Sequence, residues 1–357
     1  MKKSFFLAVA VLLLSAAAAS AQVVTEASSL TLVGKLMPTS NPYHRVDTVR
    51  YKGFTAAENE QVRCPAGMAV AFATDSPYIR IIGEGDLSYV AKNTMYLATH
   101  GYDLYIREGK RWLWAGNCAP DRKDPEKPQT LVQDMAPGLK ECLLYLPIYC
   151  DMSSIKIVTK EGSHIEPIEN PFRHRVAVWG SSFTHGISTS RAGMSYPDQF
   201  TRHTGIQTLP LGCSGNCKLQ PYFAAVLEDV EADAFLLDCF SNPSAKMIEE
   251  RLFPFIERMR AAHPGKPLIF QQTIRRERRN FNTKVEANEA AKQHMADSLM
   301  KIAVKRYKDV YYIKPSASSP LQESSVDGIH PDDYGYYLWS RSIEKPLLRI
   351  LRKYGIR

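Results

Sequence analysis

The pattern of hydrophobic and polar positions changes near the middle of the chain. From about Val23 to Thr159, short apolar or alternating runs are separated by Gly, Pro and Asp, a pattern typical of strands joined by turns. Because no long helical pattern interrupts these runs, they predict an all-β sandwich, with a hairpin turn at Arg107–Lys110. The expected strands are Val70–Thr74, Tyr78–Ile82, Thr94–Ala98, Asp103–Arg107, Arg111–Ala115 and Leu143–Tyr149.

After the polar, proline-containing segment Glu161–His174, short apolar runs alternate with amphipathic stretches. This alternation predicts an α/β domain with a parallel sheet covered on both faces, and such sheets bind ligands beyond the carboxyl ends of their strands. We therefore place a β-sandwich domain at 22–165, a linker at 166–174 and the α/β domain at 175–357. The expected strands are Val176–Trp179, Gln207–Leu211, Ala234–Cys239, Leu268–Thr273 and Val310–Ile313, and the expected helices include Ser244–Ala262, Lys284–Tyr307 and Pro331–Tyr354.

The first 21 residues have the layout of a secretory signal peptide. Lys2 and Lys3 precede the apolar run Phe5–Leu14, and Ala19-Ser20-Ala21 offers a small-residue cleavage site. The apolar run is too short for a membrane span, and no later segment is apolar for long enough to cross a bilayer. We expect an exported protein, periplasmic or secreted after cleavage near Ala21, with no stable insertion into a membrane.

The charge of the chain gives little indication of a charged partner. The formal net charge is +8, and it falls to +6 when the leader with its two lysines is removed, an excess that affects solubility more than binding. The basic run Arg275-Arg276-Glu277-Arg278-Arg279 is read as a solvated loop, with an anion-binding lip as the alternative. Because no aromatic residues alternate with these arginines, we expect no nucleic-acid partner.

Seven cysteines leave at least one thiol unpaired, although an exported chain permits disulfides. Cys213 is close enough in sequence to pair with Cys217, as is Cys142 with Cys150. Neither spacing is a zinc signature, and no histidine-rich motif accompanies them. We therefore expect structural or free thiols, and neither a metal nor another cofactor.

Candidate chemistry begins where the first strand of the α/β domain ends, at the segment Gly180–Gly186. A serine on the turn after a buried strand projects from the catalytic edge of the sheet, and Gly180 allows the backbone to turn sharply. If a helix follows Ser182, its first amides can stabilise negative charge there. The Gly-x-Ser-x-Gly elbow is not present, because the fifth position is Thr184. A simple helix cap is the alternative role for this serine.

A second candidate lies near the other end of the chain, in Asp327-Gly328-Ile329-His330-Pro331. Serine is a weak nucleophile that needs an adjacent base, and histidine serves this purpose without a large pKa shift. The imidazole in turn needs an acid to fix its tautomer, and Asp327 lies three residues before His330. An ordinary polar loop ahead of the last helix is the alternative interpretation.

Two further segments follow strands and could supply oxyanion donors. Gly215 follows the second strand and could offer an unobstructed backbone N–H, and Asn242 follows the third and could donate from its amide. Acyl transfer needs such donors at the position where the carbonyl oxygen becomes charged. Either residue alone is commonplace in a turn.

Taken in order, these four segments resemble the blocks of the SGNH (GDSL-type) hydrolase family. Gly180-Ser181-Ser182 stands in the place of the Gly-Asp-Ser block, and Gly215, Asn242 and Asp327-x-x-His330 match the later blocks. The resemblance covers roughly Arg173–Arg357 and implies a three-layer α/β/α domain of the flavodoxin-like type. It implies a catalytic triad of Ser182, His330 and Asp327, and an oxyanion hole made by the Ser182 amide, Gly215 and Asn242.

The rest of the chain narrows this resemblance to one branch of the family. Gly101-Tyr102-Asp103-Leu104-Tyr105 is similar to the Gly-x-Asp-Leu-Tyr signature of a β-rich domain that precedes some SGNH domains. Two departures separate the chain from the lipase-like branches. Ser181 replaces the usual Asp of the first block, and Phe240 and Pro243 replace the Gly and Asp that flank the third block.

The resemblance implies a serine esterase that hydrolyses an acyl ester, with acetate on a carbohydrate as the expected substrate. The partner is then a small-molecule or oligosaccharide ester, while the oligomeric state is left open. Two alternatives remain: an acyltransferase that uses the same triad, and an inactive glycan-binding protein. The second would require a lost triad residue, and none is lost in this sequence.

Overall fold

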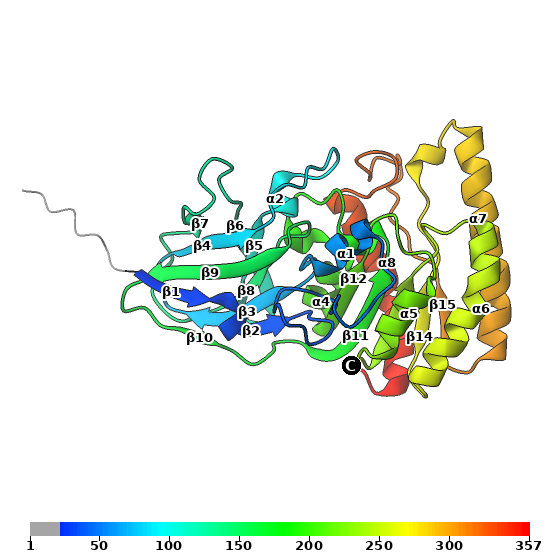
Figure 1. Ribbon diagram of the computed structural model, residues 1–357, viewed down its shortest axis with the longest axis horizontal. Helices are drawn as coiled ribbons and strands as arrows, with labels where there is room; N and C mark the ends of the chain where they lie inside the picture. The colour runs from blue at the N-terminus through cyan, green and yellow to red at the C-terminus, as the bar shows by residue number, and fades with distance from the viewer. Residues whose placement is uncertain (1–21) are drawn as a thin grey trace, which may run out of the picture.

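The computed structural model describes residues 22–357, which form a β-rich N-terminal part beside an α/β part (Figure 1). The expected signal peptide, residues 1–21, lies outside the described residues. Within the described part of the chain, no helix combines the length and the apolar character that a membrane crossing requires.

Two antiparallel sheets make up the N-terminal part. One has the order β1-β9-β4-β7, and the other has the order β10-β3-β8-β5-β6 with β2 paired to β3. Their inner faces enclose one core, in which Phe72 and Leu144 from the second sheet cluster with Ile81 and Ile157 from the first. The strands are β1 Gln22–Glu26, β2 Thr31–Val33, β3 Ala69–Thr74, β4 Ile79–Gly85, β5 Tyr102–Glu108, β6 Arg111–Cys118, β7 Gln129–Val132, β8 Lys140–Tyr145, β9 Met152–Lys160 and β10 Ile165–Pro167.

Three local predictions in this part were wrong. Thr94–Ala98 is not a strand but a loop leading into the short helix α2, Tyr96–Thr99, and the strand expected to reach Tyr149 ends at Tyr145. A helix that the sequence did not suggest, α1 (Ala56–Arg63), follows the 3-10 turn η1 (Ala27–Ser29) and β2. Only one large apolar residue, Val62, lies in α1, so its sequence lacks helical periodicity. Its start is fixed instead by a capping box between Thr55 and Glu58.

The α/β part contains a five-stranded parallel sheet of order β12-β11-β13-β14-β15. The chain therefore reverses direction across the sheet beside β11, its first strand in sequence, and a crevice opens at the carboxyl ends of the strands at such a point. The predicted three-layer architecture is confirmed. The strands are β11 Arg173–Gly180, β12 Ile206–Gly212, β13 Ala234–Asp238, β14 Leu268–Gln271 and β15 Val310–Ile313.

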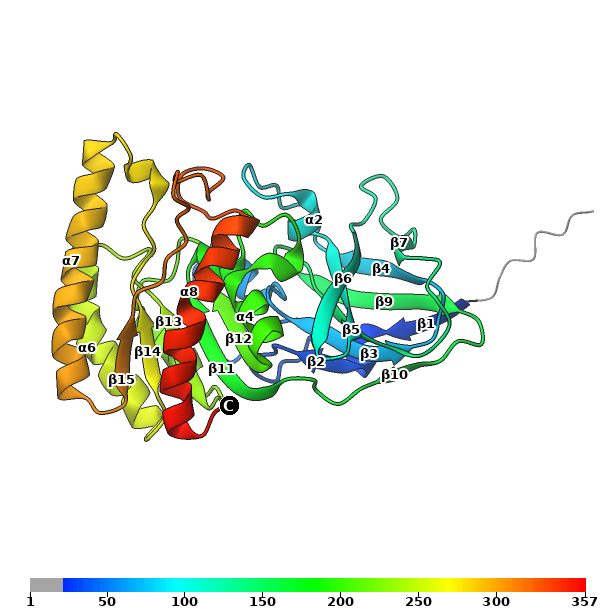
Figure 2. The same cartoon turned by 180° about the vertical axis from the view of Figure 1, so that it is seen from behind.

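Helices cover both faces of this sheet (Figures 1 and 2). On one face α4 and α8 cluster with Val176 and Val178, and on the other α5, α6 and α7 cluster with Ala177 and Trp179. Successive residues of β11 thus enter opposite cores, as expected for a strand buried on both sides. The helices are α3 Ser182–His185, α4 Tyr196–Thr204, α5 Pro221–Glu228, α6 Ala245–Ala262, α7 Thr283–Arg306 and α8 Asp333–Leu351, with 3-10 turns η2 Ala192–Met194, η3 Glu277–Arg279 and η4 Arg352–Tyr354.

The two parts share a hydrophobic core. Leu36, Val46 and Tyr51, from the segment between β2 and α1, belong to the cluster that contains Trp179 and Phe223 of the α/β part. Burial of this apolar surface fixes the β-rich part against the carboxyl-terminal edge of the parallel sheet. The loop between β4 and α2, residues 86–95, is thereby held beside that edge; we call it the β4–α2 loop.

The Gly-x-Asp-Leu-Tyr motif forms a second connection between the two parts. The Asp103 side chain is fully buried, and its carboxylate accepts hydrogen bonds from Arg191 at 3.0 Å and from the Gly193 amide at 3.1 Å. Trp114 donates to the same carboxylate at 3.0 Å. The aspartate of the motif therefore joins the β-rich part to the loop that carries η2.

Neither of the two cysteine pairs that the spacing would allow is formed. All seven cysteines lie in the described region, and each is free and buried, Cys142 in β8 and Cys213 just after β12 among them. Burial raises the pKa of both thiols to about 12, which disfavours the reactive thiolate. The thiols therefore contribute as small apolar side chains.

Candidate active site

Ser182 lies at the point where β11 ends and α3 begins. It is 6% exposed, and it is the first residue of α3. The preceding Ser181 caps the helix, because its hydroxyl accepts a hydrogen bond from the Phe183 amide at 3.3 Å. Ser181 thus performs the capping that an aspartate at this position would also perform. A side chain at Gly180 would collide with Thr184, so the turn requires glycine there.

A hydrogen-bonded chain connects Ser182 with the loop ahead of α8. The Ser182 Oγ lies 3.0 Å from Nε2 of His330, and Nδ1 of His330 lies 2.8 Å from Oδ2 of Asp327. Ser182 and His330 lie 148 positions apart in the sequence. Together with Asp327 they are the residues that the sequence predicted as a triad. The distances are those of a nucleophile, a base and an acid that fixes the base.

Asp327 is held in its charged form. Partial burial alone would raise the pKa of this carboxyl, but hydrogen bonds from the His330 backbone and side chain and from Asn93 outweigh it and lower the pKa to about 2. Oδ1 also accepts from the Ile329 and His330 amides at 2.9 and 2.8 Å. An ionised carboxylate at this place favours the tautomer of His330 with its proton on Nδ1, which leaves Nε2 to accept from Ser182.

Asn93, in the β4–α2 loop, was missed by the sequence analysis. Its amide nitrogen donates to Oδ2 of Asp327 at 2.8 Å and lies 3.2 Å from Nδ1 of His330. Since Nδ1 carries the proton that Asp327 accepts, Asn93 bonds the carboxylate rather than the imidazole. A residue of the β-rich part therefore contacts the predicted triad. No motif marks Asn93, which follows Lys92 in a stretch of mixed polarity, so only the packing of the two parts shows its position.

Gly215 and Asn242 border the same pocket as Ser182. Oδ1 of Asn242 accepts a hydrogen bond from the Cys217 amide at 3.1 Å, and this bond fixes the orientation of the side chain. Its Nδ2 makes no hydrogen bond to another residue of 22–357, so a donor is available there. Gly215 has a φ of +74°, a conformation that favours glycine, and a Cβ at this residue would meet no atom within 4 Å.

The pocket over Ser182 has a volume of about 450 Å³ and is bordered by residues of both parts. The β-rich part contributes Tyr89, Asn93 and Tyr149, and the α/β part contributes Arg276 in addition to the residues above. Pockets of this size accommodate small molecules or single groups of larger ones.

The interpretation of the basic run as a solvated loop was wrong for two of its arginines. The Arg276 side chain is only 15% exposed, and its guanidinium donates to Glu289 at 2.9 Å and to the Ser241 carbonyl at 2.8 Å. Arg279 is 8% exposed and pairs with Glu286. Arg275 and Arg278 are exposed, as predicted. The partners are two glutamates of α7, which lie outside the basic run and which the run itself did not reveal.

Asp238 is the last residue of β13 and lies next to the turn that carries Ser182. Its side chain is fully buried, and Oδ2 accepts from the Thr184 hydroxyl at 3.0 Å. Burial raises its pKa to about 8, and the bonds from Thr184 and the Ser181 amide and the charge of Arg276 offset this only in part. At neutral pH the carboxyl is therefore mostly protonated. It supports the turn as a neutral hydrogen-bonding group.

Comparisons with known proteins agree with this geometry. Residues 173–348 match the model of the GDSL-like lipase/acylhydrolase family, and residues 23–165 match the GxDLY domain, described as the N-terminus of SGNH-hydrolase-type esterases. The crystal structure of a GDSL-like lipase candidate from Bacteroides ovatus ATCC 8483 is 36% identical, with a TM-score of 0.89 over 93% of this chain and 98% of the other. The chain belongs to the GDSL-like lipase/acylhydrolase family. It is an ester-hydrolysing serine hydrolase with an N-terminal GxDLY domain.

More distant structures share the fold of this GDSL-like hydrolase. The salicylyl-acyltransferase SsfX3 from a tetracycline biosynthetic pathway is 16% identical, with a TM-score of 0.68 over 94% of this chain and 99% of its own. A family two carbohydrate esterase from Cellvibrio japonicus is 11% identical, with a TM-score of 0.59 over 93% and 98% of the two chains. No curated protein sequence matches the chain.

Proposed function

We propose that this protein is an exported carbohydrate esterase in which Ser182, His330 and Asp327 remove an acyl group, acetate in the first place, through an acyl-enzyme. The observation that carries the proposal is the continuous hydrogen-bonded chain from Asp327 through His330 to Ser182, in a pocket that also contains Gly215 and Asn242. The arrangement supports the proposed roles of nucleophile, base and acid, with candidate oxyanion donors in the same pocket.

The reaction proceeds in two displacements. Ser182 Oγ attacks the ester carbonyl while His330 Nε2 takes its proton, and the resulting oxyanion accepts hydrogen bonds from the amides of Ser182 and Gly215 and from Asn242. The C–O bond to the alcohol then breaks, and the alcohol leaves with the proton from His330. Water next attacks the acyl-enzyme and gives its proton to His330, so that the acid departs and Ser182 regains its proton.

The carbohydrate part of the proposal draws on two kinds of support. The carbohydrate esterase from Cellvibrio japonicus aligns over nearly the whole of both chains, so the two-part arrangement is compatible with that class of substrate. The leader-like residues 1–21 would deliver the enzyme to the compartment where extracellular glycans occur. Export is tested by mass spectrometry of the protein from its native host, which should give a mature N-terminus near Gln22.

Acyl transfer is the second candidate, because the acyltransferase SsfX3 aligns with a TM-score of 0.68 across both parts. The triad chemistry is shared, and only the second step differs, with an alcohol in place of water. Adding increasing concentrations of a sugar alcohol to the reaction separates the two. A transferase forms the new ester in preference to free acid, whereas an esterase releases acid throughout.

The nucleophile is tested by measuring turnover of p-nitrophenyl acetate and of acetylated oligosaccharides by the mature protein. Ser182→Ala should lower kcat by at least about 10⁴-fold, since triad residues act as a unit. Ser181→Ala is the matched comparison, because it removes the neighbouring hydroxyl, which caps α3 but does not contact His330. If Ser182→Ala retained the wild-type rate, or if Ser181→Ala were the inactive variant, the assignment would be wrong.

A further inference from the structure

Three cavities lie in series along the junction of the two parts, and the β4–α2 loop borders all of them. The middle one is the pocket over Ser182, of about 450 Å³. A cavity of about 290 Å³ shares Tyr89, Tyr149 and Ser214 with it. On the other side, a cavity of about 600 Å³ shares Asn93 with it. The pocket over Ser182 therefore has a further cavity on each side, and each of them shares lining residues with it.

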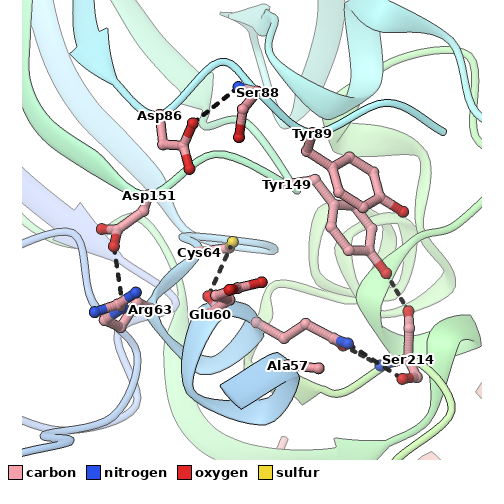
Figure 3. A pocket seen from close by; sticks show the side chains of 11 residues that line it. Ala57, Glu60, Arg63, Cys64, Asp86, Ser88, Tyr89, Tyr149, Asp151 and Ser214 are labelled. Carbon is pink, nitrogen blue, oxygen red and sulfur yellow. Dashed lines mark hydrogen bonds and ion pairs between the residues drawn. The ribbon is translucent and has the colours of Figure 1, made fainter.

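The smaller cavity, which we call the tyrosine cavity, has aromatic and charged walls (Figure 3). Tyr89 stacks on Tyr149 with ring centroids 4.2 Å apart and planes within 8°, and Tyr149 stacks on the buried His185 at 4.1 Å. Tyr89 itself is 38% exposed, so the stack supports a ring with an accessible surface. Figure 3 shows Arg63 and Asp151 across the cavity from the two tyrosines.

The charges of the tyrosine cavity indicate what it can bind. Glu60, Asp86 and Asp151 line it together with a single cation, Arg63. Three carboxylates against one guanidinium repel an anionic ligand and accept hydrogen bonds from hydroxyl groups. An alkyl chain would leave these charges desolvated without partners, which is unfavourable. Sugar rings, with hydroxyls at the edge and C–H groups on the face, match both the carboxylates and the tyrosine.

The larger cavity, which we call the serine cavity, is rich in hydroxyl groups. Thr94, Ser188, Thr189 and Ser190 line it, with Lys92 opposed by two carboxylates, Asp332 and Asp333. Ser188 is only 6% exposed, and its hydroxyl has no hydrogen-bond partner among residues 22–357. A buried hydroxyl without a partner is unfavourable unless a ligand or water completes its hydrogen bonds.

We propose that the three cavities form one glycan-binding cleft, in which an uncharged oligosaccharide binds with its acylated unit over Ser182 and its neighbouring units in the tyrosine and serine cavities. The inference rests on the proposed esterase function and specifies its substrate: an acyl group on an internal unit of a neutral oligosaccharide. The excess of carboxylates in both outer cavities excludes glycans built from uronic acids.

Chain length is the first test. For wild-type protein, KM should fall at least about tenfold from an acetylated monosaccharide to a neutral tetrasaccharide acetylated at an internal unit, which corresponds to roughly 1.4 kcal/mol of added binding. A tetrasaccharide of uronic acids with the same acetate should show no such fall. Equal KM values for all three substrates would overturn the cleft proposal while leaving the esterase proposal intact. Absence of turnover on every ester, p-nitrophenyl acetate included, would instead contradict the esterase proposal.

A variant that fills the tyrosine cavity provides the second test. Ala57 is exposed, lines this cavity and lies in the first turn of α1, whereas its neighbour Ala56 is equally exposed and does not line it. Ala57→Trp should raise the ratio of KM for the tetrasaccharide to KM for p-nitrophenyl acetate at least about fivefold, and Ala56→Trp should leave this ratio unchanged. If both variants gave the wild-type ratio, the tyrosine cavity would not bind substrate. Turnover of p-nitrophenyl acetate shows that each variant is folded.

Discussion

The carboxyl edge of the parallel sheet and the β4–α2 loop face each other across the site, and they differ in how their residues are specified. At the sheet edge, Ser182 and Asn242 follow buried strands, and local motifs mark both. In the β4–α2 loop, Tyr89 and Asn93 belong to a stretch of mixed polarity without a motif, and they reach the site because the two parts pack together.

The difference indicates that the sheet edge and the β4–α2 loop have different roles. In the proposed function, the sheet edge carries the groups that make and break bonds, and their positions follow from the parallel strands that precede them. The β4–α2 loop contributes a hydrogen bond to Asp327 and the walls of the cleft, which affect orientation and substrate choice. Variants on the sheet edge should therefore change kcat most, and variants at the junction should change stability, specificity or the finer positioning of the triad.

After Ser182→Ala, the largest effect is expected from a second residue of the sheet edge, in Asn242→Ala. Loss of an oxyanion donor should lower kcat by about 10²–10³ with KM little changed. Asn242→Asp is the matched control for structure, because it keeps the acceptor for the Cys217 amide but lacks the donor. Both variants should be impaired in steady-state turnover of p-nitrophenyl acetate. Full activity in Asn242→Asp would show that the amide does not donate to the oxyanion.

At the junction itself, Asp103→Ala should cost about 3 kcal/mol of unfolding free energy, because it leaves Arg191 and the Gly193 amide without their buried acceptor. Urea unfolding measures this change. Glu141→Ala is the control, since its pair with Arg107 is exposed on both sides and should contribute less than about 1 kcal/mol. If Asp103→Ala and Glu141→Ala lowered the unfolding free energy by the same amount, the motif would not hold the two parts together.

A smaller effect is expected where the two regions meet, from Asn93→Ala. Removing one hydrogen bond to the charged Asp327 should lower kcat roughly tenfold, with KM and the urea midpoint close to those of wild type. Val90→Ala changes an exposed residue of the same loop that borders none of the three cavities, and it should keep the wild-type kcat. A proportionate loss of stability in Asn93→Ala would indicate a structural role instead of positioning.

The smallest effect is expected from Asp238→Asn, at the residue that hydrogen-bonds the turn carrying Ser182, and it concerns stability rather than kcat. Between about pH 4 and pH 8 the unfolded chain releases the proton of this carboxyl, while the folded chain, with a pKa of about 8, retains it. Stability therefore falls as pH rises through this range. Asp238→Asn should remove this decline and gain at least about 1 kcal/mol relative to wild type at pH 8. If the unfolding free energies of wild type and Asp238→Asn changed with pH in the same way, a raised pKa of Asp238 would be contradicted.

The sequence predicted the sheet edge better than the junction for a physical reason. Buried parallel strands require continuous apolar runs, so β11 to β15 were located to within a few residues, and the residues after them followed. Helix α1 and the β4–α2 loop are stabilised by caps and by contacts with distant residues. Their sequences contain little apolar periodicity. Arg276 shows the same limit, because its partner Glu289 lies outside the basic run, on α7.

The core shared by the two parts also bears on how the chain is synthesised. The Gly34 amide bonds the Gln207 side chain, 173 residues later, and Leu36 and Val46 belong to the cluster that contains residues of β11 to β14. On the ribosome, these contacts therefore cannot form until the strands of the α/β part have been made. We expect the segment between β2 and α1 to complete its packing late in synthesis, after the contacts inside the β-rich part have formed.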